Sequence, residues 1–222
     1  MARIDLARRA QIGRDRRART RSQLVEAARG LFSDRPVEAV TIDDVVGAAG
    51  VAKGTFYVHF DSLAELQAAV ADDLARQFDE LLQPRRLALS DPVERIAAGC
   101  AAFIGQALRE PSWGALVARS AASMPSVARL ARERLSEDVR RAAADARLGD
   151  VTPGLAYELA IGIVLRTMQA AAEGGLATTP AQSVVAAILR AIGVKPAEAR
   201  RVAARVTAQD QQASPAQPSR RR

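Results

Sequence analysis

Apolar residues recur with the period of an α-helix along most of the chain, and this pattern constrains the fold more than any other feature. The first clear stripe, at positions i, i+3, i+4, i+7 and i+8, is Leu24, Ala27, Ala28, Leu31 and Phe32, the spacing of one helix face. Aromatic residues make up only 4% of the chain, and 48 of its 222 residues are alanine, which favours helices over strands. The sequence therefore predicts an all-α fold.

Capping and breaking residues divide this pattern into helices, since Thr, Ser and Asp cap helix N-termini whereas Gly and Pro end helices. We expect a first helix at about residues 20–32, a second from the Thr41 cap to Gly50, and a third at about 52–57. A long connecting helix follows and ends at Pro84. Later helices are expected at about residues 91–109, 113–122, 126–147, 155–173 and 181–192, with helical character continuing to about 206.

The formal net charge of +7 is concentrated at the two ends of the chain. Residues 1–21 hold eight arginines against two aspartates, a sum of +6, and residues 195–222 hold seven basic residues against two acidic ones, a sum of +5. Residues 22–194 hold 17 basic and 21 acidic residues and sum to −4. Basic ends favour an anionic partner, although basic tails also serve solubility, and 30 arginines against two lysines are typical of a GC-rich genome.

Several classes of protein are disfavoured by what the chain lacks. Cys100 and His59 are the only residues of their types, so we expect no internal disulfide, no zinc cluster and no cofactor. We expect no enzyme, because no phosphate-binding glycine loop, nucleophile–base pair or metal-ligand spacing occurs. The longest apolar run, residues 159–165, is far shorter than a membrane span of roughly 20 residues. With no signal peptide in evidence, we expect a cytoplasmic protein with no membrane partner.

Two short helices joined by a tight turn stand out at residues 41–60. Gly50 can take the positive φ that closes a helix, and Val51 returns the chain to the core, so the two helices can form a helix-turn-helix whose second helix enters a DNA major groove. The whole segment, TIDDVVGAAGVAKGTFYVHF from Thr41 to Phe60, resembles the TetR family of bacterial repressors. The resemblance extends from about Arg21 to Leu66 and is architectural beyond that window.

The resemblance implies a DNA-binding domain at residues 21–66 and a helical effector-binding and dimerisation domain at 67–194. These domains lie between a basic flexible arm at 1–20 and a basic, largely disordered tail at 195–222. It also implies a sequence-specific transcriptional regulator: a homodimeric repressor that a small-molecule effector releases from a pseudo-palindromic operator in double-stranded DNA. Repression or activation depends on where the operator lies. The alternative is a helix-turn-helix-derived module that binds a ligand or a protein and no operator.

Individual DNA contacts follow from the resemblance. Thr41 corresponds to a phosphate-binding hydroxyl at a helix N-terminus, Lys53 can reach a base edge or a phosphate, and Thr55 offers a hydroxyl and a methyl group. Tyr57 and His59 correspond to phosphate-contacting rings, with plain surface or packing roles as the alternatives. The predicted DNA-binding residues are Thr41, Ala52, Lys53, Gly54, Thr55, Tyr57, His59, Arg17, Arg19 and Arg21. Phe56 and Phe60 are expected to pack inward.

Three positions depart from the family pattern, and the first two of them remove a contact to DNA. Ala52 stands where the family often has serine, Leu63 where it commonly has lysine, and Pro36 where it usually has glycine. We hypothesise that arginines of the N-terminal arm replace the lost attraction by neutralising phosphates or entering a minor groove. These arginines are Arg14, Arg16, Arg17, Arg19 and Arg21.

The last two strong helices are apolar over more than one face, which suits a helix packed both on its own core and on a partner. Burial within a monomer is the alternative. The family implies a four-helix dimer interface of this kind. The predicted interface residues are Leu155, Leu159, Ile163, Val184, Val185, Ile188, Leu189 and Ile192.

The resemblance also implies an effector pocket, and large or soft side chains on the helices that would surround it suit an apolar or aromatic effector. An ordinary core role is the alternative for each of them. Arg166 needs a partner if it lies inside an apolar helix, either an anionic ligand or the nearby Glu158. The predicted pocket residues are Phe78, Phe103, Trp113, Met124, Tyr157, Arg166 and Met168.

Overall fold

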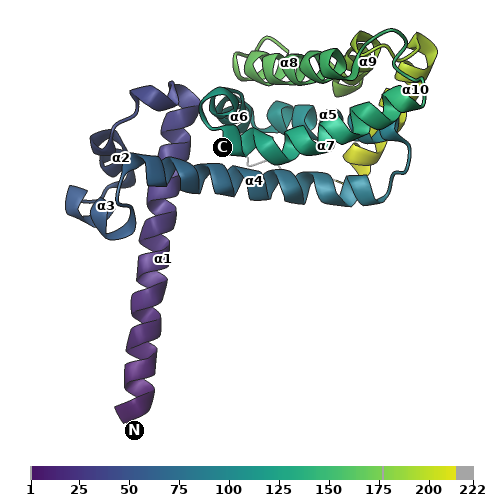
Figure 1. Cartoon of the computed structure of the whole chain (residues 1–222). Coiled ribbons are helices and arrows are strands. Elements are labelled where there is room, and N and C mark those ends of the chain that lie inside the picture. Colours follow the sequence, from purple (N-terminus) through teal and green to yellow (C-terminus); the bar gives the residue numbers. More distant parts are fainter. Residues whose placement is uncertain (1, 177, 214–222) are drawn as a thin grey trace.

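The structure, a computed structural model, describes residues 2–176 and 178–213 and is all-α, as predicted (Figure 1). A small N-terminal part is joined by one long helix to a larger helical part. The elements are α1 (Ala2–Asp34), η1 (Val37–Ala39), α2 (Ile42–Ala49), α3 (Lys53–His59), α4 (Leu63–Leu87), α5 (Pro92–Arg109), α6 (Pro111–Ser123), α7 (Pro125–Ala144), α8 (Pro153–Ala172), α9 (Ala181–Ala191) and α10 (Pro196–Ala213).

The N-terminal part is held by a small core between α1, α2, α3 and the start of α4. Phe32, Val45 and Phe56 are fully buried, and Phe60 is 1% exposed, so the inward packing predicted for Phe56 and Phe60 is confirmed. Gly50 has φ 66° at the C-cap of α2, a conformation that favours glycine. The tight turn that aims α3 outward therefore follows from the local sequence.

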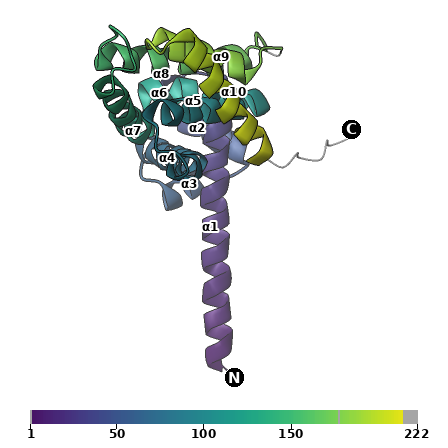
Figure 2. The same cartoon turned by 90° about the vertical axis from the view of Figure 1, so that its right-hand side faces the viewer.

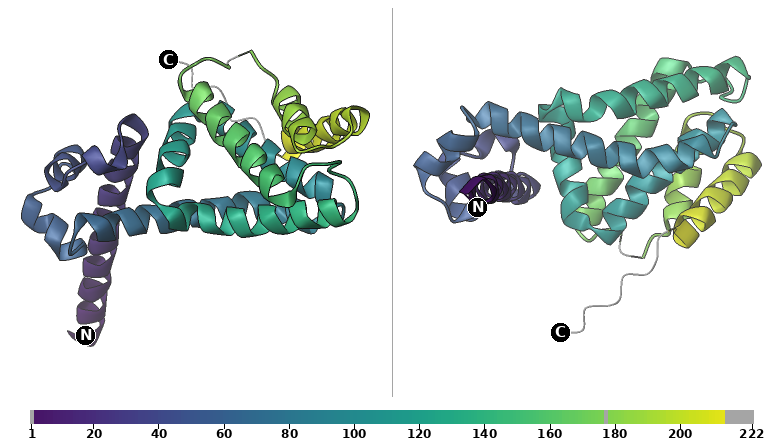
Figure 3. Two further views of the ribbon diagram at one scale, coloured as in Figure 1. Left: turned by 45° about the horizontal axis from the view of Figure 1, so that its top comes forward. Right: turned by 90° about the horizontal axis from the view of Figure 1, so that it is seen from below.

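The connecting helix α4 runs from the helix-turn-helix to the far end of the C-terminal helices (Figure 3). Its buried stripe, Leu66, Val70, Leu74 and Phe78, begins in the N-terminal core and continues into the C-terminal core. The helix was predicted to end at Pro84, but it continues to Leu87. A single helix thus belongs to both cores.

The first helix was predicted to begin at about residue 20, after a flexible arm, but it begins at Ala2. Residues 2–20 form the first part of α1, which projects away from the body of the molecule (Figure 2). Alanine and arginine are strong helix formers, and no proline precedes Pro36. Nothing in the sequence therefore stops the helix at the domain border.

The C-terminal tail was predicted to be helical to about residue 206 and largely disordered overall, and the structure forms the helix α10 over residues 196–213. Ala199, Val202, Ala203 and Val206, at helical spacing, are buried in a helix that packs on α5 and α9. Arg205 of α10 also pairs with Glu94 of α5. Burial of this stripe offsets the entropy of ordering the segment. The final residues of the predicted tail, 214–222, lie outside the described residues.

Helix α8 is long and apolar enough, by length and composition alone, to cross a membrane, although its uninterrupted apolar run is short. Only 28% of its most apolar window is buried within the chain, although it packs on α5, α6, α7 and α9. The core helix of a soluble protein can also have such a composition. The face that α8 leaves uncovered is used below.

Candidate DNA interface and ligand cavity

The recognition helix α3 lies at the end of the molecule remote from α8 to α10 (Figure 1). Phe56 anchors it in the core, while Tyr57 and Val58 are 51% and 56% exposed. Gly54 is exposed and has no heavy atom within 4 Å of where a Cβ would stand. The fold itself therefore does not require a glycine at position 54.

Thr41 caps α2 through a reciprocal set of hydrogen bonds with Asp44. The Thr41 hydroxyl and backbone N–H donate to Asp44 Oδ2 at 2.6 and 2.8 Å, and Asp44 N–H donates back to Thr41 Oγ1 at 3.2 Å. The hydroxyl, the backbone N–H and Arg35 lower the pKa of Asp44 to about 2. Thr41 remains exposed, so it can meet a phosphate only by sharing or releasing its bond to Asp44.

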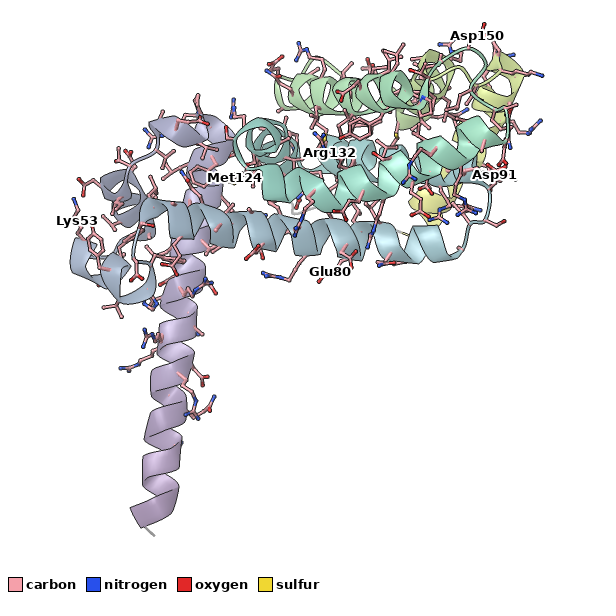
Figure 4. The ribbon with its side chains drawn as sticks, in the orientation of Figure 1. Lys53, Glu80, Asp91, Met124, Arg132 and Asp150 are labelled. Carbon is pink, nitrogen blue, oxygen red and sulfur yellow. The ribbon has the colours of Figure 1, made fainter. Side chains whose placement is uncertain are left out.

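Each lysine or arginine between residues 22 and 60 is paired with a carboxylate. Lys53, at the outer edge of α3 (Figure 4), lies 2.8 Å from Asp43 Oδ1, and this pairing raises the pKa of Lys53. Arg29 and Arg35 lie 2.9 Å from carboxylates of α4 and α2 respectively. The helix-turn-helix therefore offers little unpaired positive charge to DNA.

The base of the projecting part of α1 contacts the C-terminal end of α3. Arg17 Nη2 donates a hydrogen bond to the carbonyl of Val58 at 3.0 Å, and the Arg21 guanidinium lies 4.8 Å from the centre of the Phe60 ring. Burial and then these two arginines lower the pKa of His59, so His59 is neutral at neutral pH. Arg19, the third predicted arm residue, is exposed.

The remaining predicted residues of this surface lie with the recognition helix. Ala52 is the exposed N-cap residue of α3, and Thr55 is half-buried one turn into the same helix. The side chain of Ala52 makes no capping hydrogen bond to α3.

A cavity of about 200 Å³ lies among α4, α5, α6, α7 and α8. Four predicted pocket residues line it: Phe78, Phe103, Tyr157 and Met168. Trp113 packs behind this wall, its ring stacked on Phe103 with the centroids 6.2 Å apart. Met124 is buried at the α6–α7 junction (Figure 4). Trp113 and Met124 therefore support or neighbour the cavity and do not line it.

Arg166 is not a pocket residue, contrary to prediction. Its side chain is 64% exposed and pairs with Glu173 at 3.4 Å, because position 166 falls on the outer face of α8. The arginine at the cavity is Arg132 of α7, whose guanidinium lies 5.3 Å from the centre of the Tyr157 ring. Burial raises the pKa of Tyr157, so its hydroxyl stays protonated. The polar pattern of residues 126–147 carried no signal for Arg132.

A chain of contacts joins this cavity to the helix-turn-helix. Arg29 of α1 donates to Asp73 Oδ2 at 2.9 Å, and Gln77 Nε2 donates to the same oxygen at 2.8 Å. Trp113 Nε1 donates to Gln77 Oε1 at 3.2 Å, and Trp113 stacks on Phe103 of the cavity wall. We call this series, Arg29–Asp73–Gln77–Trp113–Phe103, the relay.

The predicted dimer residues fall into two groups. Val185, Ile188, Leu189 and Ile192 are fully buried within the chain, because these positions of α9 and its C-cap face α5, α8 and α10. They are corrected here from interface to core. Leu155, Leu159, Ile163 and Val184 are exposed or half-buried, and Leu155 is 52% exposed.

An outward helix-turn-helix braced by α1 and α4 is the arrangement of a helix-turn-helix DNA-binding protein. The model described as "Bacterial regulatory proteins, tetR family" matches residues 24–70. A "Tetracyclin repressor-like, C-terminal domain" model matches residues 91–205. The chain therefore belongs to the TetR family and is a DNA-binding transcriptional regulator, a class without enzymatic activity.

Named relatives match over a minor part of the chain. The regulator TtgR of Pseudomonas putida is 42% identical over 62 residues, 28% of this chain and 30% of that protein. The activator FasR of Mycolicibacterium smegmatis is 40% identical over 86 residues, 37% and 38% of the two chains. The chain thus aligns with about a third of the length of these relatives.

Solved structures match over much more of the chain. RolR in complex with resorcinol is 29% identical, with a TM-score of 0.61 over 86% of this chain and 96% of that one. A gamma-butyrolactone receptor is 21% identical, with a TM-score of 0.67 over 87% and 98%. The latter likeness concerns the fold alone.

Proposed function

We propose that this regulator acts in the cytoplasm as a homodimer that binds a pseudo-palindromic operator and leaves it when a compact aromatic effector enters the cavity. Where the operator overlaps a promoter, the dimer represses transcription. The observation that carries the proposal is the relay, which places the cavity wall a few contacts from α1 of the DNA-binding part.

The DNA-binding surface is α3 together with the N-terminus of α2. Lys53, Gly54 and Tyr57 are the exposed positions nearest a major groove, and Thr41 lies at a helix N-terminus, which suits a phosphate. The two solvent-exposed apolar groups of α3, on Tyr57 and Val58, support a role in contacts, because apolar side chains left outside the core often mark binding surfaces.

A dimer is needed because one short helix reads only a few base pairs, so two copies must span two half-sites. The face we assign to the dimer is the uncovered side of α8 with the neighbouring part of α9. It carries Leu155, Leu159, Ile163 and Val184, with the exposed Gly162 between them. Small and apolar residues allow two such helix pairs to pack as a four-helix interface.

The cavity favours a small effector with an aromatic ring. Its volume of about 200 Å³ is below the roughly 300–1,000 Å³ of common ligand pockets but above the ~150 Å³ that holds benzene in an engineered cavity. Phe78 and Phe103 offer ring contacts. The Tyr157 hydroxyl, Arg132 and Glu158 offer hydrogen bonds to a polar substituent. Resorcinol, the ligand of the RolR complex, is of this class.

Release follows from the position of α6. This helix contributes Val117 and Ala121 to the cavity and packs on α1 and η1. An effector that displaces Phe103 and Trp113 moves α6 and α4 together. The population then shifts toward a spacing of the two α3 helices that no longer fits adjacent grooves.

The test uses two readouts on the full chain. Fluorescence anisotropy with labelled intergenic DNA from beside its own gene should show salt-sensitive binding. Emission from Trp113, the only tryptophan, should change on titration with resorcinol, and bound DNA should be released. Ala121→Phe, which fills the cavity, should abolish the emission change and leave DNA binding intact. Absence of salt-sensitive binding to any such fragment would favour the alternative module without an operator.

A further inference from the structure

The positive charge that DNA binding requires is concentrated on the projecting part of α1, not in the helix-turn-helix. Lys53, Arg29 and Arg35 are all in ion pairs, and the lowered pKa of His59 keeps that side chain neutral. Nonspecific attraction to DNA depends on cations that neutralise phosphates. Arginines in the arm, by contrast, are exposed over residues 11–19.

These arginines lie in a defined register on α1. Ala28 and Leu24 are buried in the N-terminal core, and the same face continues toward the N-terminus at steps of three and four residues through Arg21, Arg17 and Arg14. We call these three residues the arginine stripe. The stripe therefore faces the same side of α1 as the core contacts with α2, α3 and α4.

No carboxylate among the described residues pairs with the stripe. Arg14 donates to the neutral amide of Gln11 at 2.6 Å, Arg17 to the carbonyl of Val58, and Arg21 lies over the Phe60 ring. Two of the three thus contact the C-terminal end of the recognition helix. A phosphate near that end of α3 would meet a preformed row of cations.

The direction of the arm decides which DNA it can reach. In Figures 1 and 2, α1 projects away from the side of the molecule that carries α8 and α9. If that side faces the partner, the two arms point away from the dyad of the dimer. Residues 2–20 of a helix span roughly 28 Å, or about 8 base pairs at 3.4 Å each.

We propose that the arginine stripe binds the phosphates of DNA flanking each half-site on its outer side, so that the protein contacts a longer duplex than its two recognition helices cover. This inference rests on the proposed function, because it needs both DNA binding and the α8–α9 dimer. In this proposal the arm supplies most of the affinity for DNA, and α3 supplies the preference for a particular base sequence.

The test compares two duplexes that carry the operator mapped by hydroxyl-radical footprinting. One duplex ends at the outer edges of the half-sites. The other extends 10 base pairs further on both sides, which is enough to reach along the ~28 Å length of the arm. The chain should bind the long duplex more than about tenfold tighter, with a steeper salt dependence. In Arg14→Ala/Arg17→Ala this preference should disappear and the slope should fall by about 3.6, which is 0.9 for each of four arginines in the dimer.

A matched control removes the same charge from the opposite face of the arm. Arg8 and Arg19 lie on that face, in register with Ile12 and Asp15, so Arg8→Ala/Arg19→Ala should keep the preference for the long duplex. Arg14→Ala alone, which leaves the contacts to α3 intact, should lose about half of what the double variant loses. Circular dichroism verifies that the helix is retained.

Each other outcome counts against the proposal. Equal losses in the stripe and opposite-face variants would mean that the arm attracts DNA only through its total charge. Equal losses on the long and trimmed duplexes would mean that Arg17 acts through α3. If the unaltered chain binds no duplex at all, the proposed function itself fails, and that result is distinct from binding without a preference for flanks.

Discussion

Trp113 Nε1 of α6 donates a hydrogen bond to Gln77 Oε1 of α4 at 3.2 Å, and Gln77 Nε2 donates to Asp73, the carboxylate that binds Arg29 of α1. Both ends of the Gln77 amide are therefore satisfied, which fixes its orientation. The amide joins a ring stacked on the cavity wall to an ion pair with the DNA-binding part. We regard Gln77 as the centre of the relay.

Gln77→Leu keeps the side-chain volume but removes both hydrogen bonds. We expect the affinity for resorcinol, measured by Trp113 emission, to stay within about threefold of that of the unaltered chain. Allosteric coupling typically changes affinity about 5–150-fold, and we expect the effect of resorcinol on operator affinity to be severalfold smaller in this variant. Anisotropy titrations with and without resorcinol measure this. Gln67→Leu, on the same helix, is the control. Undiminished coupling in Gln77→Leu would show that the relay transmits nothing.

Asp43→Asn should strengthen DNA binding. The substitution frees Lys53 from its 2.8 Å ion pair and removes a negative charge beside the recognition helix. If the freed lysine of each protomer neutralises one phosphate, the salt slope rises by about 1.8. Asp34→Asn makes the same charge change at the other end of the domain and should have little effect. A weaker complex in Asp43→Asn would instead mean that Asp43 positions Lys53 for its contact.

The stability of the helix-turn-helix should depend on pH through Asp44. Its pKa is lowered from 3.8 to about 2, so the folded state holds the proton less tightly than the unfolded state. The contribution of Asp44 is therefore fully present above pH 3.8 and is lost as the pH falls through about 2. Urea unfolding measures the free energy of unfolding of the unaltered chain and of Asp44→Asn. The difference between the two should shrink as the pH is lowered from 5 to 2. Asp72→Asn controls for loss of a carboxylate, and a constant excess would contradict the assignment.

Charge on the uncovered face of α8 should separate the dimer. We expect Leu155→Arg/Ile163→Arg to have a monomeric mass by light scattering at micromolar concentration and to bind operator DNA at least ~100-fold more weakly, since half-sites bound singly lose the gain from linkage. Ala197→Arg, at an exposed position of α10, should remain dimeric. A monomeric mass for the unaltered chain would overturn the assigned interface.

The sequence was sufficient to predict those parts of the structure that depend on residues close to one another along the chain. The Thr41–Asp44 cap and the Gly50 turn each depend on residues a few positions apart, and turn chemistry encodes them directly. Helical periodicity predicts the inward packing of Phe56. The extent of the first and last helices was less well predicted. Residues 2–20 and 196–213 are helical, because helix propensity carries the first onward from the domain and burial on α5 and α9 stabilises the second.

The sequence by itself determined that the chain is all-helical, that it carries a TetR-type helix-turn-helix, and that its positive charge lies at the ends. Only the tertiary structure decided which side chains meet across long separations. It brought Arg29 to Asp73 and Gln77 to Trp113, 44 and 36 residues apart. It also placed Arg132 and not Arg166 at the cavity. Periodicity specifies the face of a helix, but which neighbour covers that face depends on how all the helices pack.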